Sequence, residues 1–147
     1  MAMQSESEHF MQLALAEGRK AVPVCADNPP VGCLLVRNGA VIASGHTNAP
    51  GAPHAEAMAL QQLEGDAADV TAYVTLEPCS FHGRTPSCAK ALIKAGIKHV
   101  CVGIIDPDPR NNGRGIALLR DAGIEVEVGV LATEVNTALQ PYLGKAK

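Results

Sequence analysis

Aromatic side chains are scarce in this chain, whose 147 residues include two Phe, two Tyr and no Trp. The core must therefore be built from aliphatic residues, and there is no aromatic platform on which single-stranded bases could stack. Lys and Arg form no block, and the net charge of −3 lacks the basic footprint of a nucleic-acid-binding protein. We therefore expect a small-molecule substrate and no nucleic-acid partner.

Long apolar runs are also missing. No stretch of about eighteen apolar residues occurs, and residues 1–10 lack the apolar centre of a secretory signal. This pattern predicts no membrane association and a cytoplasmic location. The five cysteines are an odd number, and in a reducing compartment metal binding or simple burial explains them better than disulfides.

The length and a hydrophobic content of 47% fit one globular domain over residues 1–147. A first helix is expected after Ser5 and Ser7, with its end at Gly18. Asn38-Gly39 predicts a hairpin between the first two strands. Strands then alternate with helices, which predicts an α/β fold whose sheet is parallel in its second half and covered on both faces. The expected strands are 31–36, 40–44, 70–76, 99–105 and 124–130, and the later helices are 53–65, 86–95, 115–122 and 133–143.

His54, Glu56, Cys79 and Cys88 indicate a metal site. His54 and Glu56 begin the second expected helix, whereas the cysteines, nine positions apart, lie between a strand and the next helix. One imidazole and two thiolates form a three-ligand set, which leaves tetrahedral zinc an open position for water. We therefore predict a catalytic zinc ion between two helix N-termini, with Glu56 moving protons as in deaminases with an H-x-E and P-C-x-x-C pattern.

Residues 75–88 read Thr-Leu-Glu-Pro-Cys-Ser-Phe-His-Gly-Arg-Thr-Pro-Ser-Cys. This segment closely resembles the zinc segment of the pyrimidine deaminase domain in bacterial bifunctional riboflavin-biosynthesis deaminase/reductases. Further similar segments follow in the same order, at residues 28–33, 53–56, 106–109, 113–115 and 122–126. The resemblance implies the cytidine deaminase-like fold, a three-layer α/β/α sandwich around a mixed five-stranded sheet.

In that family the deaminase removes the 2-amino group of a diaminopyrimidinone that carries a ribosylamino 5′-phosphate. By position, the resemblance implies that Asn28 hydrogen-bonds the pyrimidine edge and that His46 lines the pocket. Backbone groups near Ala55 and at Leu76 to Glu77 are natural positions for holding the ring. The resemblance also implies that Arg84 and Asp106 contact the ribose phosphate, for which the bidentate guanidinium of arginine is well suited.

The chain also departs from that family. The departures are an extra residue between His46 and His54, Ala57-Met58 in place of Val-His, Phe81 in place of His, Asp108 in place of Asn, and Asn111-Asn112 in place of a more apolar pair. The sequence also ends at Lys147, where the bifunctional proteins continue into a reductase. We therefore expect a stand-alone deaminase, with a separate reductase as its pathway partner.

Two alternatives remain open at this point. The first is a deaminase of a free base or nucleoside, such as guanine, cytosine or cytidine. The second is a non-enzymatic domain with a structural zinc ion, which would need a fourth protein ligand. His82 is the candidate closest in sequence. Small deaminases of this superfamily commonly build their pockets between subunits, so the resemblance implies a homodimer or homotetramer.

Overall fold

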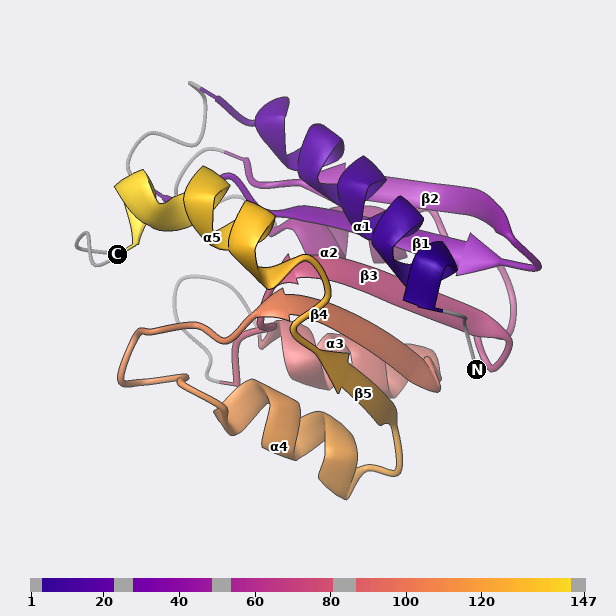
Figure 1. Cartoon of the computed structure of the whole chain (residues 1–147). Helices are drawn as coiled ribbons and strands as arrows, with labels where there is room; N and C mark the ends of the chain where they lie inside the picture. The colour runs from indigo at the N-terminus through magenta and orange to yellow at the C-terminus, as the bar shows by residue number, and fades with distance from the viewer. Residues whose placement is uncertain (1–3, 23–27, 49–53, 81–86, 144–147) are drawn as a thin grey trace.

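A mixed five-stranded sheet forms the middle layer of the protein, with its strands in the order β2-β1-β3-β4-β5 (Figure 1). The computed structural model describes residues 4–22, 28–48, 54–80 and 87–143. The strands are β1 (Gly32–Arg37), β2 (Ala40–His46), β3 (Val70–Leu76), β4 (His99–Ile104) and β5 (Glu125–Val128). β1 runs antiparallel to β2 and β3, whereas β3, β4 and β5 are parallel. The predicted mixed sheet is therefore confirmed.

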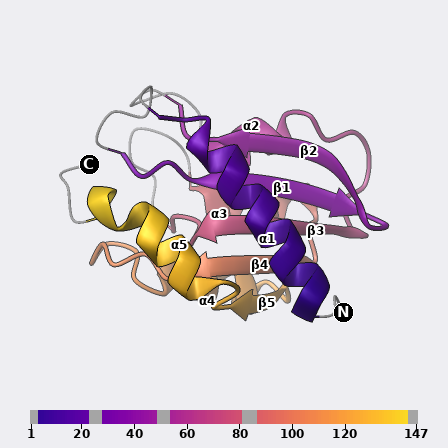
Figure 2. The same ribbon diagram turned by 45° about the horizontal axis from the view of Figure 1, so that its top comes forward.

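Helices cover both faces of this sheet (Figure 2). They are α1 (Gln4–Arg19), α2 (Ala55–Leu60), α3 (Cys88–Ala95), α4 (Arg114–Asp121) and α5 (Ala132–Leu139), which a short 3-10 helix (Gln140–Tyr142) follows. α1 and α5 lie on one face, and α2, α3 and α4 lie on the other. Each face has its own apolar cluster, built mainly from Ala, Val, Leu and Ile. The three-layer α/β/α sandwich is therefore confirmed.

The hairpin between β1 and β2 forms at the expected dipeptide. Asn38 and Gly39 have φ values of 52° and 77°, which suit a turn of the type I′ class. β2 extends beyond its predicted end at residue 44 and reaches His46, which pairs with Gly32 at the start of β1. Strand pairing therefore brings His46 to the edge of the sheet where the chain enters β1.

The predicted limits of the first helix were wrong. Ser7 lies inside α1 and donates a hydrogen bond to Glu127 (3.5 Å), so it does not precede the helix. Gly18 also lies inside α1, which ends at Arg19. A Cβ at Gly18 would lie 2.5 Å from the carbonyl oxygen of Pro30. This glycine therefore allows the end of α1 to pack against the segment that leads into β1, and it does not stop the helix.

The second helix is shorter than predicted, because α2 ends at Leu60 and turns follow. The side chain of Gln62 donates to the carbonyl oxygens of Ser44 (2.6 Å) and Met58 (3.1 Å), which ties the first of these turns to β2. Within the described parts of the chain, no helix combines the length and the apolar character that crossing a bilayer requires.

Candidate metal centre

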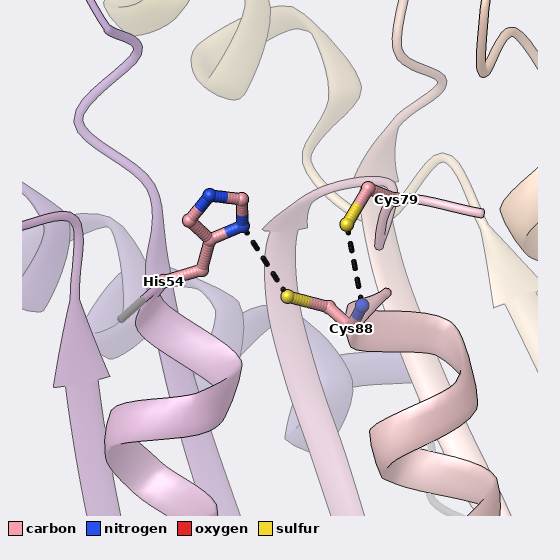
Figure 3. Close-up of side chains that lie close together, drawn as sticks. All are labelled: His54, Cys79 and Cys88. Atoms are coloured by element: carbon pink, nitrogen blue, oxygen red, sulfur yellow. Dashed lines mark hydrogen bonds between the residues drawn. The ribbon is translucent and has the colours of Figure 1, made fainter. Parts of the chain in front are cut away.

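Three potential metal donors meet beyond the C-terminal end of β3, between α2 and α3 (Figure 3). His54 is the N-cap residue of α2, Cys79 follows the end of β3, and Cys88 is the first residue of α3. Their ligand atoms all lie within 4.8 Å of one another, and His54 Nδ1 is 3.4 Å from Cys88 Sγ. The predicted placement between two helix N-termini is confirmed, and the three residues are positioned to bind a metal ion.

Hydrogen bonds at the start of α3 hold Cys79 in place. Its Sγ accepts a bond from the Cys88 backbone N–H (3.2 Å), as Figure 3 shows. Its carbonyl oxygen accepts bonds from the Ser87 hydroxyl (2.8 Å) and the Ala89 N–H (3.1 Å). The same Ser87 hydroxyl accepts a bond from the Lys90 N–H and so caps α3. The helix and the first thiol therefore position each other.

The two thiols have very different acidities. Hydrogen bonding between the two side chains, assisted by His54 and the Cys88 amide, lowers the pKa of Cys79 to about 4. The same interaction, followed by burial, raises the pKa of Cys88. The environment therefore favours the thiolate form at Cys79. Because both thiols must be deprotonated to bind a metal, the affinity of this centre for a metal ion depends on pH.

Glu56 lies beside these donors in the first turn of α2 and is only 4% exposed. Burial, followed by the negative charge of Cys79, raises the pKa of Glu56 to about 7, although His54 and Cys88 act in the opposite direction. A carboxyl group that titrates near neutral pH can both accept and return a proton. The environment therefore suits the predicted proton-transfer role, which stays a prediction.

The side chain of Glu77, for which the sequence predicted no role, organises the neighbouring loop. Its buried carboxylate accepts hydrogen bonds from the N–H groups of Asp106 (3.1 Å), Gly113 (2.9 Å) and Ile116 (3.0 Å). These bonds attach the end of β4 and the start of α4 to the segment just before Cys79. The available sequence signal was an acidic residue between an apolar strand and the Pro-Cys pair, since a carboxylate that becomes buried there needs hydrogen-bond donors.

Asp106, one of the two residues expected at the substrate phosphate, is 5% exposed. Its Oδ1 accepts a hydrogen bond from the Asp108 N–H (3.0 Å). Its backbone N–H is held by Glu77. The other phosphate residue, Arg84, lies outside the described residues, as does His82. The phosphate contacts therefore stay predictions.

Asn28 is partly buried and lies before the Pro29-Pro30 pair. The Thr47 hydroxyl donates to the carbonyl oxygen of Pro29 (2.7 Å) and accepts from the Val31 N–H (2.9 Å). Thr47 was missed in the sequence analysis, yet it fastens the segment that carries Asn28 to the end of β2. Contact between Asn28 and a pyrimidine stays a prediction.

His46 pairs with a residue of α1. Its Nδ1 lies 2.8 Å from Glu17 Oε2, and both side chains are largely buried. Burial opposes ionisation of Glu17, but hydrogen bonds from His46 and Lys20 outweigh it and lower the pKa of Glu17. The preceding Gly45 faces α2, where a Cβ would lie 2.2 Å from the carbonyl oxygen of Ala55. Because side chains alternate along a strand, His46 points to the α1 face.

The contact between Gly45 and the Ala55 carbonyl also places Ala55, which is 1% exposed in the first turn of α2. Its backbone therefore lies next to His54 and Glu56 at the candidate metal centre. The metal donors lie at the N-termini of α2 and α3, on the other side of the sheet from α1. The predicted substrate contacts of His46 and Ala55 both stay predictions.

A three-layer sandwich with one His and two Cys donors at two helix N-termini defines a zinc-dependent deaminase. The family described as "Cytidine and deoxycytidylate deaminase zinc-binding region" matches residues 4–104. The chain belongs to this family. The predicted use of zinc and the predicted deaminase class are thereby confirmed.

Within this family, the chain is similar to riboflavin biosynthesis proteins. The protein RibD of Chlamydia trachomatis is 47% identical over 134 residues, which are 91% of this chain and 36% of the relative. The structure of Acinetobacter baumannii RibD (form 2) superposes with a TM-score of 0.91 at 40% identity, covering 97% of this chain and 40% of that one. The resemblance inferred from residues 75–88 is confirmed.

A Thermotoga maritima structure is also similar, with a TM-score of 0.87 and 38% identity over 95% of this chain and 40% of that chain. That protein is a diaminohydroxyphosphoribosylaminopyrimidine deaminase/5-amino-6-(5-phosphoribosylamino)uracil reductase. The chain therefore spans well under half the length of these relatives.

Proposed function

We propose that this chain catalyses the hydrolytic deamination of diaminohydroxyphosphoribosylaminopyrimidine, with release of ammonia. The observation that carries the proposal is the buried Glu56 in the same helical turn as the metal donor His54, beside Cys79 and Cys88. The choice of substrate is supported by the Thermotoga maritima relative, whose name includes this deaminase activity.

The three donors fit a zinc ion. Zinc binds imidazole nitrogen at about 2.0 Å and thiolate at about 2.3 Å, so tetrahedral donors lie about 3.5–3.8 Å apart. The 3.4 Å between His54 Nδ1 and Cys88 Sγ is close to this spacing, and small side-chain rotations suffice within the 4.8 Å limit of the cluster. Zinc at this position supplies a Lewis acid that lets water ionise near neutral pH.

Glu56 would then carry both protons of the attacking water. The water oxygen bonds to the ring carbon that bears the amino group, while Glu56 accepts the first proton and passes it to the ring nitrogen. Glu56 next transfers the second proton to the amino group. The carbon–nitrogen bond breaks, ammonia leaves, and the ring keeps a carbonyl group in its place.

We assign the substrate contacts as the resemblance implies. Asn28 would bind the pyrimidine edge, His46 would line the pocket, and the Ala55 backbone would hold the ring. Arg84 and Asp106 would contact the ribose phosphate. Two hydrogen bonds support this assignment. Thr47 donates to the carbonyl oxygen of Pro29, next to Asn28, and the backbone N–H of Asp106 donates to Glu77. They fix the backbone at or beside two of the assigned residues.

The proton-transfer role can be tested with Glu56→Gln. We expect ammonia release to fall by about 10²–10⁴, or more because the group acts twice, while the protein stays folded and keeps its zinc. Glu64→Gln, at an exposed position beyond α2, is the matched control and should retain activity. Near-normal turnover in Glu56→Gln would exclude the role.

The substrate can be tested with the phosphorylated ribosylaminopyrimidine and its dephosphorylated form. A charged hydrogen bond from Arg84 should favour the phosphorylated form by about ten- to a hundredfold in kcat/KM, and Arg84→Ala should reduce this preference. Equal rates on both forms, or ammonia only from guanine, cytosine or cytidine, would instead favour the free-base or nucleoside alternative. Zinc-loaded protein that releases ammonia from none of these compounds would favour a structural zinc domain.

The remaining parts of the proposal concern the domain, the cellular location, the assembly and the next reaction step. We infer one domain over residues 1–147, a cytoplasmic location, and a homodimer or homotetramer. We also infer that a reductase consumes the product, since the Thermotoga maritima relative combines deaminase and reductase in one protein. Light scattering of the purified chain tests the assembly, and a monomer that is fully active would overturn it.

A further inference from the structure

A buried amide side chain contacts the backbone on both sides of Cys79. Asn111 is fully buried, and its Nδ2 donates a hydrogen bond to the carbonyl oxygen of Pro78 (3.2 Å). Its Oδ1 accepts a bond from the Ser80 N–H (3.1 Å). One side chain therefore restrains the residues immediately before and after a metal donor.

The same amide joins this segment to α4. Asn111 Oδ1 also accepts a hydrogen bond from the N–H of Gly115, in the first turn of α4 (3.1 Å). A Cβ at Gly115 would lie 1.8 Å from the Pro78 carbonyl oxygen, so glycine alone permits this close approach. Glu77 binds two further N–H groups at the same end of α4. Residues 77–80 are thereby clamped to α4.

This clamp acts on the thiol because Cys79 has a short side chain. The Cα–Cβ bond is the single rotatable bond that places Sγ. For a given rotamer, the position of the sulfur therefore follows from the backbone of residues 78–80. The exposed neighbour Asn112 makes no comparable contact with Pro78 or Ser80 among the described residues.

We propose that Asn111 is a positioning residue of the metal centre. It holds the Cys79 backbone so that the thiolate meets His54 and Cys88 at the separation that zinc requires. Ligands held in advance bind a metal more tightly, and groups beyond the direct ligands commonly change metal affinity by about 10–100-fold. The inference rests on the zinc site of the proposed function and is independent of the substrate.

The test compares the zinc affinity of the full chain with that of Asn111→Leu. Leucine keeps the branched shape of asparagine but removes its three hydrogen bonds to the backbone of Pro78, Ser80 and Gly115. It also removes a longer hydrogen bond from Asn111 Nδ2 to Asp106 Oδ2 (3.5 Å). Zinc affinity is measured by competition with a chromophoric chelator, after removal of bound metal. We expect Asn111→Leu to bind zinc about 10–100-fold more weakly, while Asn112→Gly, which suits the positive φ of 25° at this position, binds as the original chain does.

Cobalt substitution separates positioning from mere stabilisation of the fold. Cobalt bound by thiolates absorbs visible light, and its spectrum reports the geometry of the ligands. We expect the spectrum to change in Asn111→Leu and to stay the same in Asn112→Gly. If the leucine variant does not fold, Asn111→Ala takes its place. The smaller side chain leaves room for water to bond the backbone groups of Pro78, Ser80 and Gly115 without fixing their geometry. We expect weaker zinc binding in this variant as well.

A folded Asn111 variant with unchanged zinc affinity and an unchanged cobalt spectrum would overturn the inference, even if its melting temperature fell. This outcome would leave the proposed function intact. A wild-type chain that binds no zinc would overturn both. Failure of the ammonia assays with normal zinc binding would contradict only the proposed function.

Discussion

Glu56 makes the stability of the metal-free protein depend on pH. Burial, followed by the charge of Cys79, raises its pKa from 4.5 to about 7. A raised pKa means that the folded state disfavours the ionised carboxylate. The contribution of this group to stability is therefore complete below about pH 4.5 and is lost as the pH rises towards about 7.

The size of this effect follows from the shift. Each pKa unit corresponds to about 1.4 kcal/mol, so the full loss is about 3 kcal/mol. Most of it falls between about pH 5 and about pH 8, where the unfolded carboxyl is already ionised and the folded one still titrates. Glutamine cannot ionise, so Glu56→Gln should escape this loss. The stability of the variant relative to the wild type should therefore rise by about 2–3 kcal/mol over this range.

Urea unfolding of the chelator-treated wild type and of Glu56→Gln, at about pH 5 and at about pH 8, measures this difference. The cysteine thiols titrate in both proteins, so comparing the variant with the wild type largely removes their contribution. Glu64→Gln, in an exposed position, should show no such change. Zinc should reduce the effect, because its positive charge favours the carboxylate. A stability difference that is equal at both pH values would refute the reasoning.

Two further predictions concern the metal donors and the loop that supports them. The original chain should carry about one zinc ion per chain, and Cys79→Ser or Cys88→Ser should lose it, whereas Cys101→Ser should retain it. Elemental analysis measures the zinc content. Full zinc in either ligand variant would contradict the assignment. Glu77→Gln should lower the free energy of unfolding by about 1–3 kcal/mol, because an amide cannot accept all three backbone bonds, with Glu64→Gln as the control. Unchanged urea unfolding of Glu77→Gln would argue against this supporting role.

Local patterns predicted much of the fold. The Asn38-Gly39 turn, the residue limits of β3 and the alternation of strands with helices depend on short-range preferences, and the structure confirms them. The predicted end of α1 was wrong, because Gly18 has a different role from the one expected. Gly18 looked like a helix stop, but it is needed where α1 approaches the Pro30 carbonyl. A close approach between distant segments leaves no local signal in the sequence.

Residue types alone indicated the chemistry of the metal centre, because an imidazole, two thiols and a nearby carboxyl keep their ligand and proton-transfer character in any fold. Their order relative to the strands and helices was also sufficient to place them at helix N-termini. The groups that hold this centre in position could not be predicted, because they come from distant parts of the chain. Asn111 lies 31 residues from Ser80 and 33 from Pro78, and Glu77 binds groups 29–39 residues away. The packing of α4 against the end of the sheet determines which of these groups meet. A buried polar group needs hydrogen-bond partners, and those partners are the donors and acceptors that the fold brings next to it.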